Sequence, residues 1–179
     1  MHPHKPDLHV NHLKGAPVSK LVPYAGLILT ISCVIIFAAR FYLFEGYVAK
    51  LYGSKYTRLS VTQKRTFINH HVAGSIKLLL VLAAAYPFLA VVAGTSDLHS
   101  PFAGSKSVKM GDVLLVISEV FTTMYIFELF YRVKVSPISA LHHVGAMVIA
   151  QSAIVLGLDP AHEREGTIEF VLCLVWGEF

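Results

Sequence analysis

Four long apolar stretches divide the chain, and short polar segments separate them. The stretches cover residues 21–39, 72–94, 113–131 and 138–158. About 20 apolar residues in a helix rise by about 30 Å, which matches the hydrocarbon core of a bilayer. Lipid offers the backbone no hydrogen-bond partner, so a spanning segment must satisfy its own amides as a helix. The pattern therefore predicts four transmembrane helices, with the first continuing to residue 44.

Composition supports a membrane protein, and the end of the chain adds a shorter apolar run. Of the 179 residues, 55% are hydrophobic and 15% are charged, whereas soluble domains carry about 25% charged residues. Residues 167–179 form a fifth apolar run that would rise only about 20 Å as a helix. We interpret it as a truncated fifth span, with a short interfacial helix as the alternative. The predicted fold is an all-α, polytopic transmembrane helical bundle with four full spans plus a truncated fifth.

The segment before the first span differs sharply in character from the rest. Residues 1–20 hold four histidines among lysines and prolines. Such tracts can bind metal, but no cluster of cysteines or carboxylates completes a site here. We therefore predict a disordered tail over residues 1–20, a first transmembrane helix over 21–44 and a partial membrane domain over 60–179.

The lysines and arginines of the loops predict an orientation. The first and third loops together hold seven of them, against six in the tail, the second loop and the fourth loop. Positively charged loops tend to stay in the cytoplasm. We expect the first and third loops on the cytoplasmic side and the amino terminus in the lumen. This use of basic residues at membrane flanks accounts for the net charge of +4, so we expect no nucleic-acid partner.

Two pairs of adjacent histidines stand where the second and fourth apolar stretches begin. His70-His71 follows the first loop, and His142-His143 follows the third loop, just after Glu128 has closed the third stretch. Loops one and three share a side if all four spans cross. We therefore expect these five residues at similar shallow depth on one membrane face, where titratable groups are costly and are often functional.

Other polar residues of the spans can be placed by helical spacing. Lys77 follows His70 by seven positions, so it shares a helix face and lies about 10 Å deeper. Glu128 and Arg132 are four positions apart and can form an ion pair. Glu119 lies about half a turn round the helix from Glu128, so we expect it to face a different helix contact. Together with the two histidine pairs, Lys77, Glu128 and Arg132 could line a polar cavity that is open to one side of the membrane.

Three kinds of chemistry fit the histidine pairs. Imidazole can accept a proton from a hydroxyl or an amine, or be acylated, while a neighbouring carboxylate orients it. Alternatively, the four histidines and Glu128 could hold a di-iron centre, but such sites need more histidines at HxxxH and HxxHH spacings than this chain offers, so we predict no metal. The third interpretation is structural, with hydrogen bonds between helices. The residues alone leave catalysis and structure open.

Two segments around the second histidine pair resemble a known domain. Residues 125–132 (YIFELFYR) and 136–145 (SPISALHHVG) are similar to the central signature of the TLC domain, which is found in multi-pass membrane proteins connected with lipids. Residues 67–71 (FINHH) and the stretch up to Pro87 resemble the opening helices of that domain. The resemblance covers residues 60–179, and it implies a helical bundle in the endoplasmic reticulum with more spans than this chain holds.

The resemblance also implies roles for particular residues. The ceramide synthases of this family transfer an acyl chain from acyl-CoA to a sphingoid amine, and His142-His143 matches their catalytic pair. This chain has Met147 where the synthases have a threonine, and it lacks their aspartate pair. It is therefore more similar to the non-synthase branch, whose members act in membrane-lipid homeostasis, sensing or transport.

These observations predict a function in lipid handling. We expect membrane lipids as partners, bound in a polar cavity between the helices, and no cofactor. The alternative is an acyl-CoA-dependent acyltransferase of the ceramide-synthase type, in which acyl-CoA is a substrate; the oligomeric state is left open, a homo-oligomer included. The predicted catalytic residues are His142, His143 and Glu128, and the predicted lipid- or headgroup-binding residues are His70, His71, Lys77 and Arg132.

Overall fold

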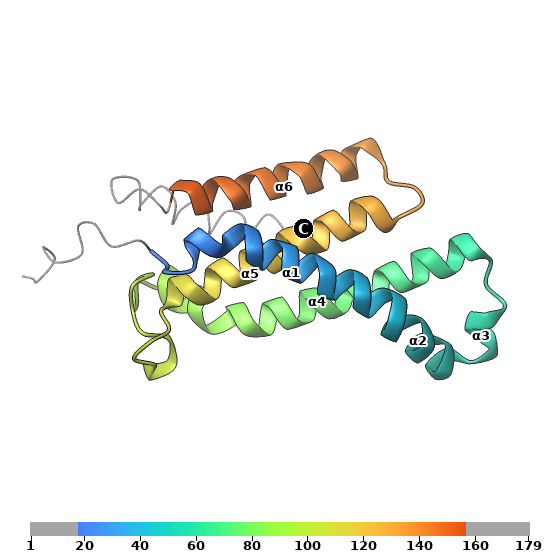
Figure 1. The fold of residues 1–179 in the computed structure, drawn as a ribbon, viewed down its shortest axis with the longest axis horizontal. Helices are drawn as coiled ribbons and strands as arrows, with labels where there is room; N and C mark the ends of the chain where they lie inside the picture. Colours follow the sequence, from blue (N-terminus) through green and yellow to red (C-terminus); the bar gives the residue numbers. More distant parts are fainter. Residues whose placement is uncertain (1–17, 157–179) are drawn as a thin grey trace, which may run out of the picture.

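The computed structural model describes residues 18–156, and in this part of the chain every regular element is a helix (Figure 1). Four of its helices are long and apolar enough to cross a membrane, which confirms the predicted all-α bundle of a multi-pass membrane protein. The elements are η1 (Val22–Tyr24), α1 (Ala25–Ala38), η2 (Ala39–Phe44), α2 (Glu45–Tyr52), α3 (Ser54–Thr57), α4 (Val61–Val92), η3 (Phe102–Gly104), α5 (Met110–Tyr131) and α6 (Pro137–Leu156). Residues 1–17 of the predicted tail over 1–20, and the predicted fifth span, lie outside the described residues.

The first two spans are longer than the apolar pattern predicts. The first candidate span runs over Val22–Tyr52 and ends at Gly53, whose positive φ of 53° suits glycine. The second, α4, begins at Val61 because Ser60 and Gln63 form a capping box. Its 32 residues rise by about 48 Å. His70-His71 therefore lies within this helix and not at its start, because the polar flank before the pair is already helical.

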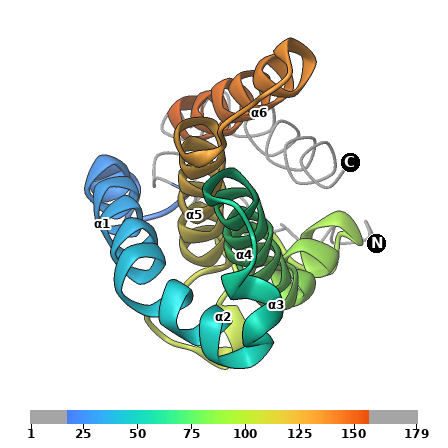
Figure 2. The same ribbon diagram turned by 90° about the vertical axis from the view of Figure 1, so that its right-hand side faces the viewer.

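Helix α5 forms the centre of the bundle. It packs against α1, α4 and α6, and Figure 2 shows it between them. In its most apolar window 67% of the residues are buried, against 11% in the first span. The outer helices expose large apolar side chains such as Val34, Leu82 and Leu141, as a surface that faces lipid does. Polar side chains on α5 are therefore shielded by protein on several sides.

The connections at the two ends alternate as the predicted topology requires. Figure 1 shows the α3–α4 segment and the α5–α6 connection at the same end of the bundle. At the opposite end of the bundle, the start of α1 and the end of α4 lie near the start of α5. Glu128 near the end of α5 and the first turns of α6 therefore lie at the end where α4 begins. We call this the α5–α6 turn end.

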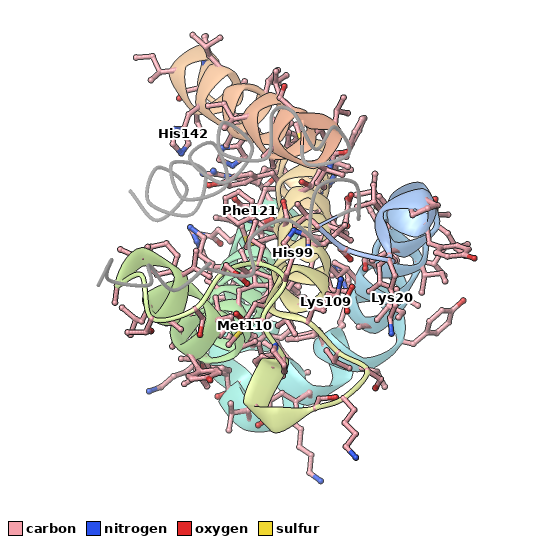
Figure 3. The ribbon with its side chains drawn as sticks, turned by 90° about the vertical axis from the view of Figure 1, so that its left-hand side faces the viewer. Lys20, His99, Lys109, Met110, Phe121 and His142 are labelled. Atoms are coloured by element: carbon pink, nitrogen blue, oxygen red, sulfur yellow. The ribbon has the colours of Figure 1, made fainter. Side chains whose placement is uncertain are left out.

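Two polar contacts and one close approach fix the opposite end. Ser19 Oγ donates to Asp112 Oδ1 at 2.6 Å, and Lys20 Nζ donates to the Ser107 carbonyl at 2.6 Å. Figure 3 shows Lys20 and Lys109 at this end. A Cβ at Gly111 would lie 2.5 Å from the Val18 carbonyl oxygen, so only glycine allows the two backbones to approach this closely. These contacts anchor the start of α1 to the start of α5.

Candidate functional site

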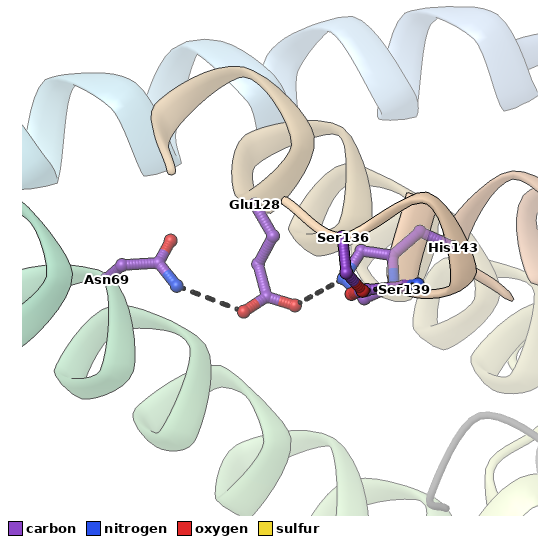
Figure 4. A network of polar contacts seen from close by, with 5 residues as sticks. All are labelled: Asn69, Glu128, Ser136, Ser139 and His143. Carbon is purple, nitrogen blue, oxygen red and sulfur yellow. Dashed lines mark hydrogen bonds and ion pairs between the residues drawn. The ribbon is translucent and has the colours of Figure 1, made fainter. Parts of the chain in front are cut away.

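A chain of hydrogen bonds links α4, α5 and α6 through Glu128. Asn69 Nδ2 on α4 donates to Glu128 Oε1 at 3.1 Å, and His143 Nε2 on α6 lies 2.9 Å from Glu128 Oε2 (Figure 4). All three side chains are buried, with exposed fractions of 1% for Asn69, 8% for Glu128 and 7% for His143. The carboxylate on the central helix thus accepts one hydrogen bond from each of two neighbouring helices.

The local sequence places His143 opposite Glu128. Arg132 at the end of α5 has extended backbone angles, so the helix stops there and the chain turns. Ser136 then caps α6, since its Oγ accepts from the Ser139 amide at 3.1 Å. Pro137 occupies the first helical position, where its lack of an N–H costs nothing. This short, firmly capped turn brings the second turn of α6 beside the last turn of α5.

The hydrogen-bond pattern assigns a proton to one imidazole nitrogen. A carboxylate can only accept, so His143 Nε2 carries the hydrogen that is donated to Glu128. When the ring is neutral, Nδ1 therefore holds a lone pair. Nδ1 is buried and has no partner among the described residues, and the same is true of Asn69 Oδ1. Buried polar atoms are nearly always paired in folded proteins. His143 Nδ1 and Asn69 Oδ1 can therefore each accept a hydrogen bond from a further donor.

The two members of the second histidine pair differ in environment. His143 is buried and its ring centroid lies 4.4 Å from that of Tyr125. His142 is partly exposed, and its ring centroid lies 6.2 Å from that of Tyr125 and 5.9 Å from that of His143. Successive helical residues point about 100° apart, so only one of the pair can face Glu128. The structure therefore joins His143, and not His142, to the carboxylate.

The first histidine pair does not join this chain of hydrogen bonds. His71 Nδ1 lies 2.9 Å from the Phe67 carbonyl, which can only accept, so Nδ1 carries a hydrogen. Its Nε2 lies 2.9 Å from the Tyr52 hydroxyl at the end of α2. His70 is exposed. On this stretch of α4 it is Asn69 that faces α5, so His70 and His71 point to other sides.

The two predicted basic residues are not tied to Glu128 either. The expected ion pair between Glu128 and Arg132 is wrong. Arg132 leaves the helix with extended backbone angles, and its contact with Glu128 is through the backbone, where the Arg132 amide donates to the Glu128 carbonyl at 3.1 Å. Lys77 is half-buried and forms no hydrogen bond or ion pair with another described residue. Their predicted contact with a headgroup stays a prediction.

A second buried polar contact lies nearer the middle of α5. Gln151 Nε2 on α6 donates to Glu119 Oε2 at 3.1 Å and lies 3.5 Å from Thr122 Oγ1. Glu119 is fully buried, and its Oε1 has no partner among the described residues. Glu119 and Glu128 have separate partners, as expected, but Gln151 lies on α6, which also supplies His143 to Glu128. The long glutamate and glutamine side chains reach the α5–α6 boundary from the flank of α5, so α6 provides partners for both carboxylates.

Asn69 is the site residue that the sequence analysis missed. It stands directly before the first histidine pair, and His70 and His71 were predicted as site residues in its place. A signal was present, because Asn69 shares a helical face with the apolar residues Val72, Ala73 and Ile76. A polar residue on the apolar face of a spanning helix is expected to have a polar partner on its neighbour.

Comparisons with models of protein families, with curated proteins and with solved structures find no match to this chain. Among residues 18–156, no group of three or more histidine, cysteine, aspartate or glutamate side chains is arranged to hold a metal ion. The Asn69–Glu128–His143 contacts therefore define the candidate site.

We predict that Glu128→Ala destabilises the bundle by about 1–3 kcal/mol for each buried partner left without an acceptor. Glu128→Gln should cost less, because its amide oxygen can still accept from Asn69. The measurement is reversible unfolding of the purified protein in mixed micelles, followed by circular dichroism. His70→Ala is the matched control, since His70 is exposed on α4. A Glu128→Ala protein as stable as His70→Ala would show that these contacts contribute nothing.

Proposed function

We propose that this protein handles membrane lipids, and that it binds the polar headgroup of a lipid beside the Asn69–Glu128–His143 chain. The observation that carries the proposal is the pair of buried acceptors without partners, His143 Nδ1 and Asn69 Oδ1. They lie in a bundle of four apolar helices, where a lipid is the most abundant small molecule. The resemblance of residues 60–179 to the TLC domain supports the same function.

The chemistry of the two acceptors restricts the headgroup. A neutral imidazole nitrogen and an amide oxygen both require a hydrogen-bond donor. A hydroxyl or an amine can donate to them, whereas a quaternary ammonium group or a fully ionised phosphate cannot. We therefore infer that the bound lipid carries a hydroxyl or a primary amine, as sphingoid bases, diacylglycerols and ethanolamine lipids do. Lys77 and Arg132 are proposed to contact an acidic part of the same ligand.

The alternative function is acyl transfer from an acyl-CoA. It is favoured by one observation, because the bond from Nε2 to Glu128 leaves His143 Nδ1 as the basic nitrogen. A lipid hydroxyl or amine would form a bond to the thioester carbonyl carbon and give its proton to Nδ1. The carbon–sulfur bond would then break and CoA would leave with the proton. Glu128 would stabilise the imidazolium formed in this step.

Binding is tested by photo-crosslinking in nanodiscs with three bifunctional lipids: a sphingoid base, a diacylglycerol and a phosphatidylcholine. We expect the wild type to be labelled by the first two and weakly by phosphatidylcholine, which has no donor. His143→Gln keeps an N–H for Glu128 and removes the Nδ1 acceptor, so its labelling should fall roughly tenfold, the equivalent of about 1.4 kcal/mol. Lys106→Gln, at an exposed position in the connection before α5, is the control and should be labelled like the wild type.

Equal labelling of His143→Gln and wild type would contradict the proposed site. Adding a radiolabelled acyl-CoA to the same preparations distinguishes acyl transfer from lipid binding alone. Acylated lipid produced by the wild type and not by His143→Gln would favour acyl transfer. Crosslinking that is lost in His143→Gln, without any turnover by the wild type, would favour binding alone.

We further propose that the protein resides in the endoplasmic reticulum, with the α5–α6 turn end in the cytoplasm and the amino terminus in the lumen. The seven lysines and arginines of the first and third loops support this orientation. Single cysteines introduced at exposed Lys55 and Lys106 in a Cys33→Ser, Cys173→Ser background test it. In sealed microsomes, an impermeant maleimide should label the first position and spare the second, and the reverse pattern would overturn the orientation.

A further inference from the structure

A basic cluster lies in the α5–α6 turn end of the bundle, apart from the Glu128 contacts. Arg40 and Arg65 both approach Tyr131, the last residue of α5. Their guanidinium carbons lie 4.8 Å and 5.1 Å from the centroid of the Tyr131 ring. Arg40 Nε also donates to the Tyr131 hydroxyl, and Arg65 Nη2 donates to the Tyr131 carbonyl at 2.8 Å. Two cations from separate helices are thus held against one aromatic ring.

The helices place both arginines inward. Arg40 belongs to η2, a π-helical segment within the first span, and only 6% of the residue is exposed. Such π segments occur often at functional sites. Arg65 precedes the buried residues Ile68 and Asn69 by three and four positions, so it lies on the face of α4 that packs against α5. Neither arginine is therefore fully exposed to solvent.

The acidic groups nearby do not balance this charge. Glu45 Oε2 lies 3.0 Å from Arg40 Nη1, but 54% of the Glu45 side chain is exposed. Arg65 has no acidic partner among the described residues. Lys64 adds a third cation, with its Nζ 5.5 Å from the centroid of the Tyr56 ring. Three positive charges therefore face the half-exposed carboxylate of Glu45, while Glu128, one turn away on α5, is already held by Asn69 and His143. This excess of positive charge favours the binding of an anion.

An unpaired hydroxyl lies in the same place. Tyr56 on α3 is 3% exposed, and its hydroxyl has no hydrogen-bond partner among the described residues. It packs in one apolar cluster with Tyr131 and Val48. Burial raises the pKa of Tyr56 above its usual value, Glu45 raises it further and Arg40 lowers it. The hydroxyl thus stays protonated, lies near Arg40 and can donate a hydrogen bond.

We propose that Arg40, Arg65, Lys64 and the Tyr56 hydroxyl form a binding site for a phosphate group. Phosphate oxygens only accept hydrogen bonds, and guanidinium, ammonium and phenol groups donate them. This site therefore differs in chemistry from the Glu128 site, whose free atoms are acceptors. The ligand is an anionic phospholipid headgroup or a soluble organic phosphate.

Thermal unfolding of the purified full-length protein in micelles tests the site. The probes are dioctanoyl phosphatidic acid, dioctanoylglycerol, which lacks the phosphate, and glycerol 3-phosphate. Tyr56→Phe is the decisive variant, because it removes only a hydroxyl that has no partner in the structure and should leave the fold intact. Arg65→Gln removes a charge, and Arg65→Lys restores it. The matched controls are Tyr47→Phe and Arg58→Gln, both at exposed positions near the cluster.

We expect phosphatidic acid to raise the unfolding temperature of the wild type saturably. Tyr56→Phe should weaken this binding about tenfold, because a hydrogen bond to a charged group is lost. Arg65→Gln should weaken it at least as much, with partial recovery in Arg65→Lys, and the two controls should match the wild type. The same dependence on the variants with glycerol 3-phosphate would identify a soluble phosphate as a ligand of the proposed site.

The proposal is overturned if neither phosphate compound binds the wild type saturably, or if Tyr56→Phe binds as tightly as Tyr47→Phe. It is also overturned if dioctanoylglycerol binds with the same affinity and the same dependence on Tyr56 and Arg65 as phosphatidic acid. If Arg65→Gln fails to fold, Tyr56→Phe alone decides the outcome. The proposed role of the Glu128 site is unaffected by any of these results, because its test uses different residues and different lipids.

Discussion

The structure depends on one buried carboxylate that two helices satisfy together. Glu128 accepts from Asn69 on α4 and from His143 on α6, and all three side chains are almost completely removed from solvent. In an apolar bundle, helices gain little from hydrophobic contact with one another, because lipid tails are equally apolar. Polar contacts and close packing therefore decide which helix faces meet. Glu128 sets the rotation of α4 and α6 about the central helix α5.

The α5–α6 turn end thus has two regions of opposite hydrogen-bonding character. Around Glu128 the free buried atoms, His143 Nδ1 and Asn69 Oδ1, are acceptors. Around Tyr131, one turn away on α5, the groups supplied by Arg40 and Arg65 are donors. A lipid headgroup presents both kinds of group, since its hydroxyl or amine donates and its phosphate accepts. The proposed functions of the two regions are compatible with one ligand or with two.

The sequence was sufficient for the class of fold and for part of the site. Runs of apolar residues predict spanning helices because their length is set by bilayer thickness, and the order of loops and spans places Glu128 and His143 at one end. Their pairing follows from position, since both lie within about two turns of a short connection. The helix starts were harder to predict. The largely polar residues 61–71 belong to α4 because a capping box begins the helix at Val61, and hydropathy does not report the energy of such a cap.

Helix rotation explains the remaining differences. Each histidine pair looks like one unit in the sequence, yet neighbours on a helix point about 100° apart. Packing therefore selected His143 over His142, and Asn69 over both His70 and His71. Arg132 lost its expected partner because α5 ends at Tyr131. Arg40 of η2 and Arg65 of α4 meet because both approach Tyr131 at the end of α5.

Nitrogen NMR of the protein with ¹⁵N-labelled histidine tests the central claim most directly. The signals of His143 are identified by their loss in His143→Gln. In neutral imidazole, we predict a proton on Nε2 and none on Nδ1, and we predict that Glu128→Ala shifts the Nε2 signal because its hydrogen-bond acceptor is lost. A proton on Nδ1 of His143 in the wild type, or an Nε2 signal that Glu128→Ala leaves unchanged, would contradict the account.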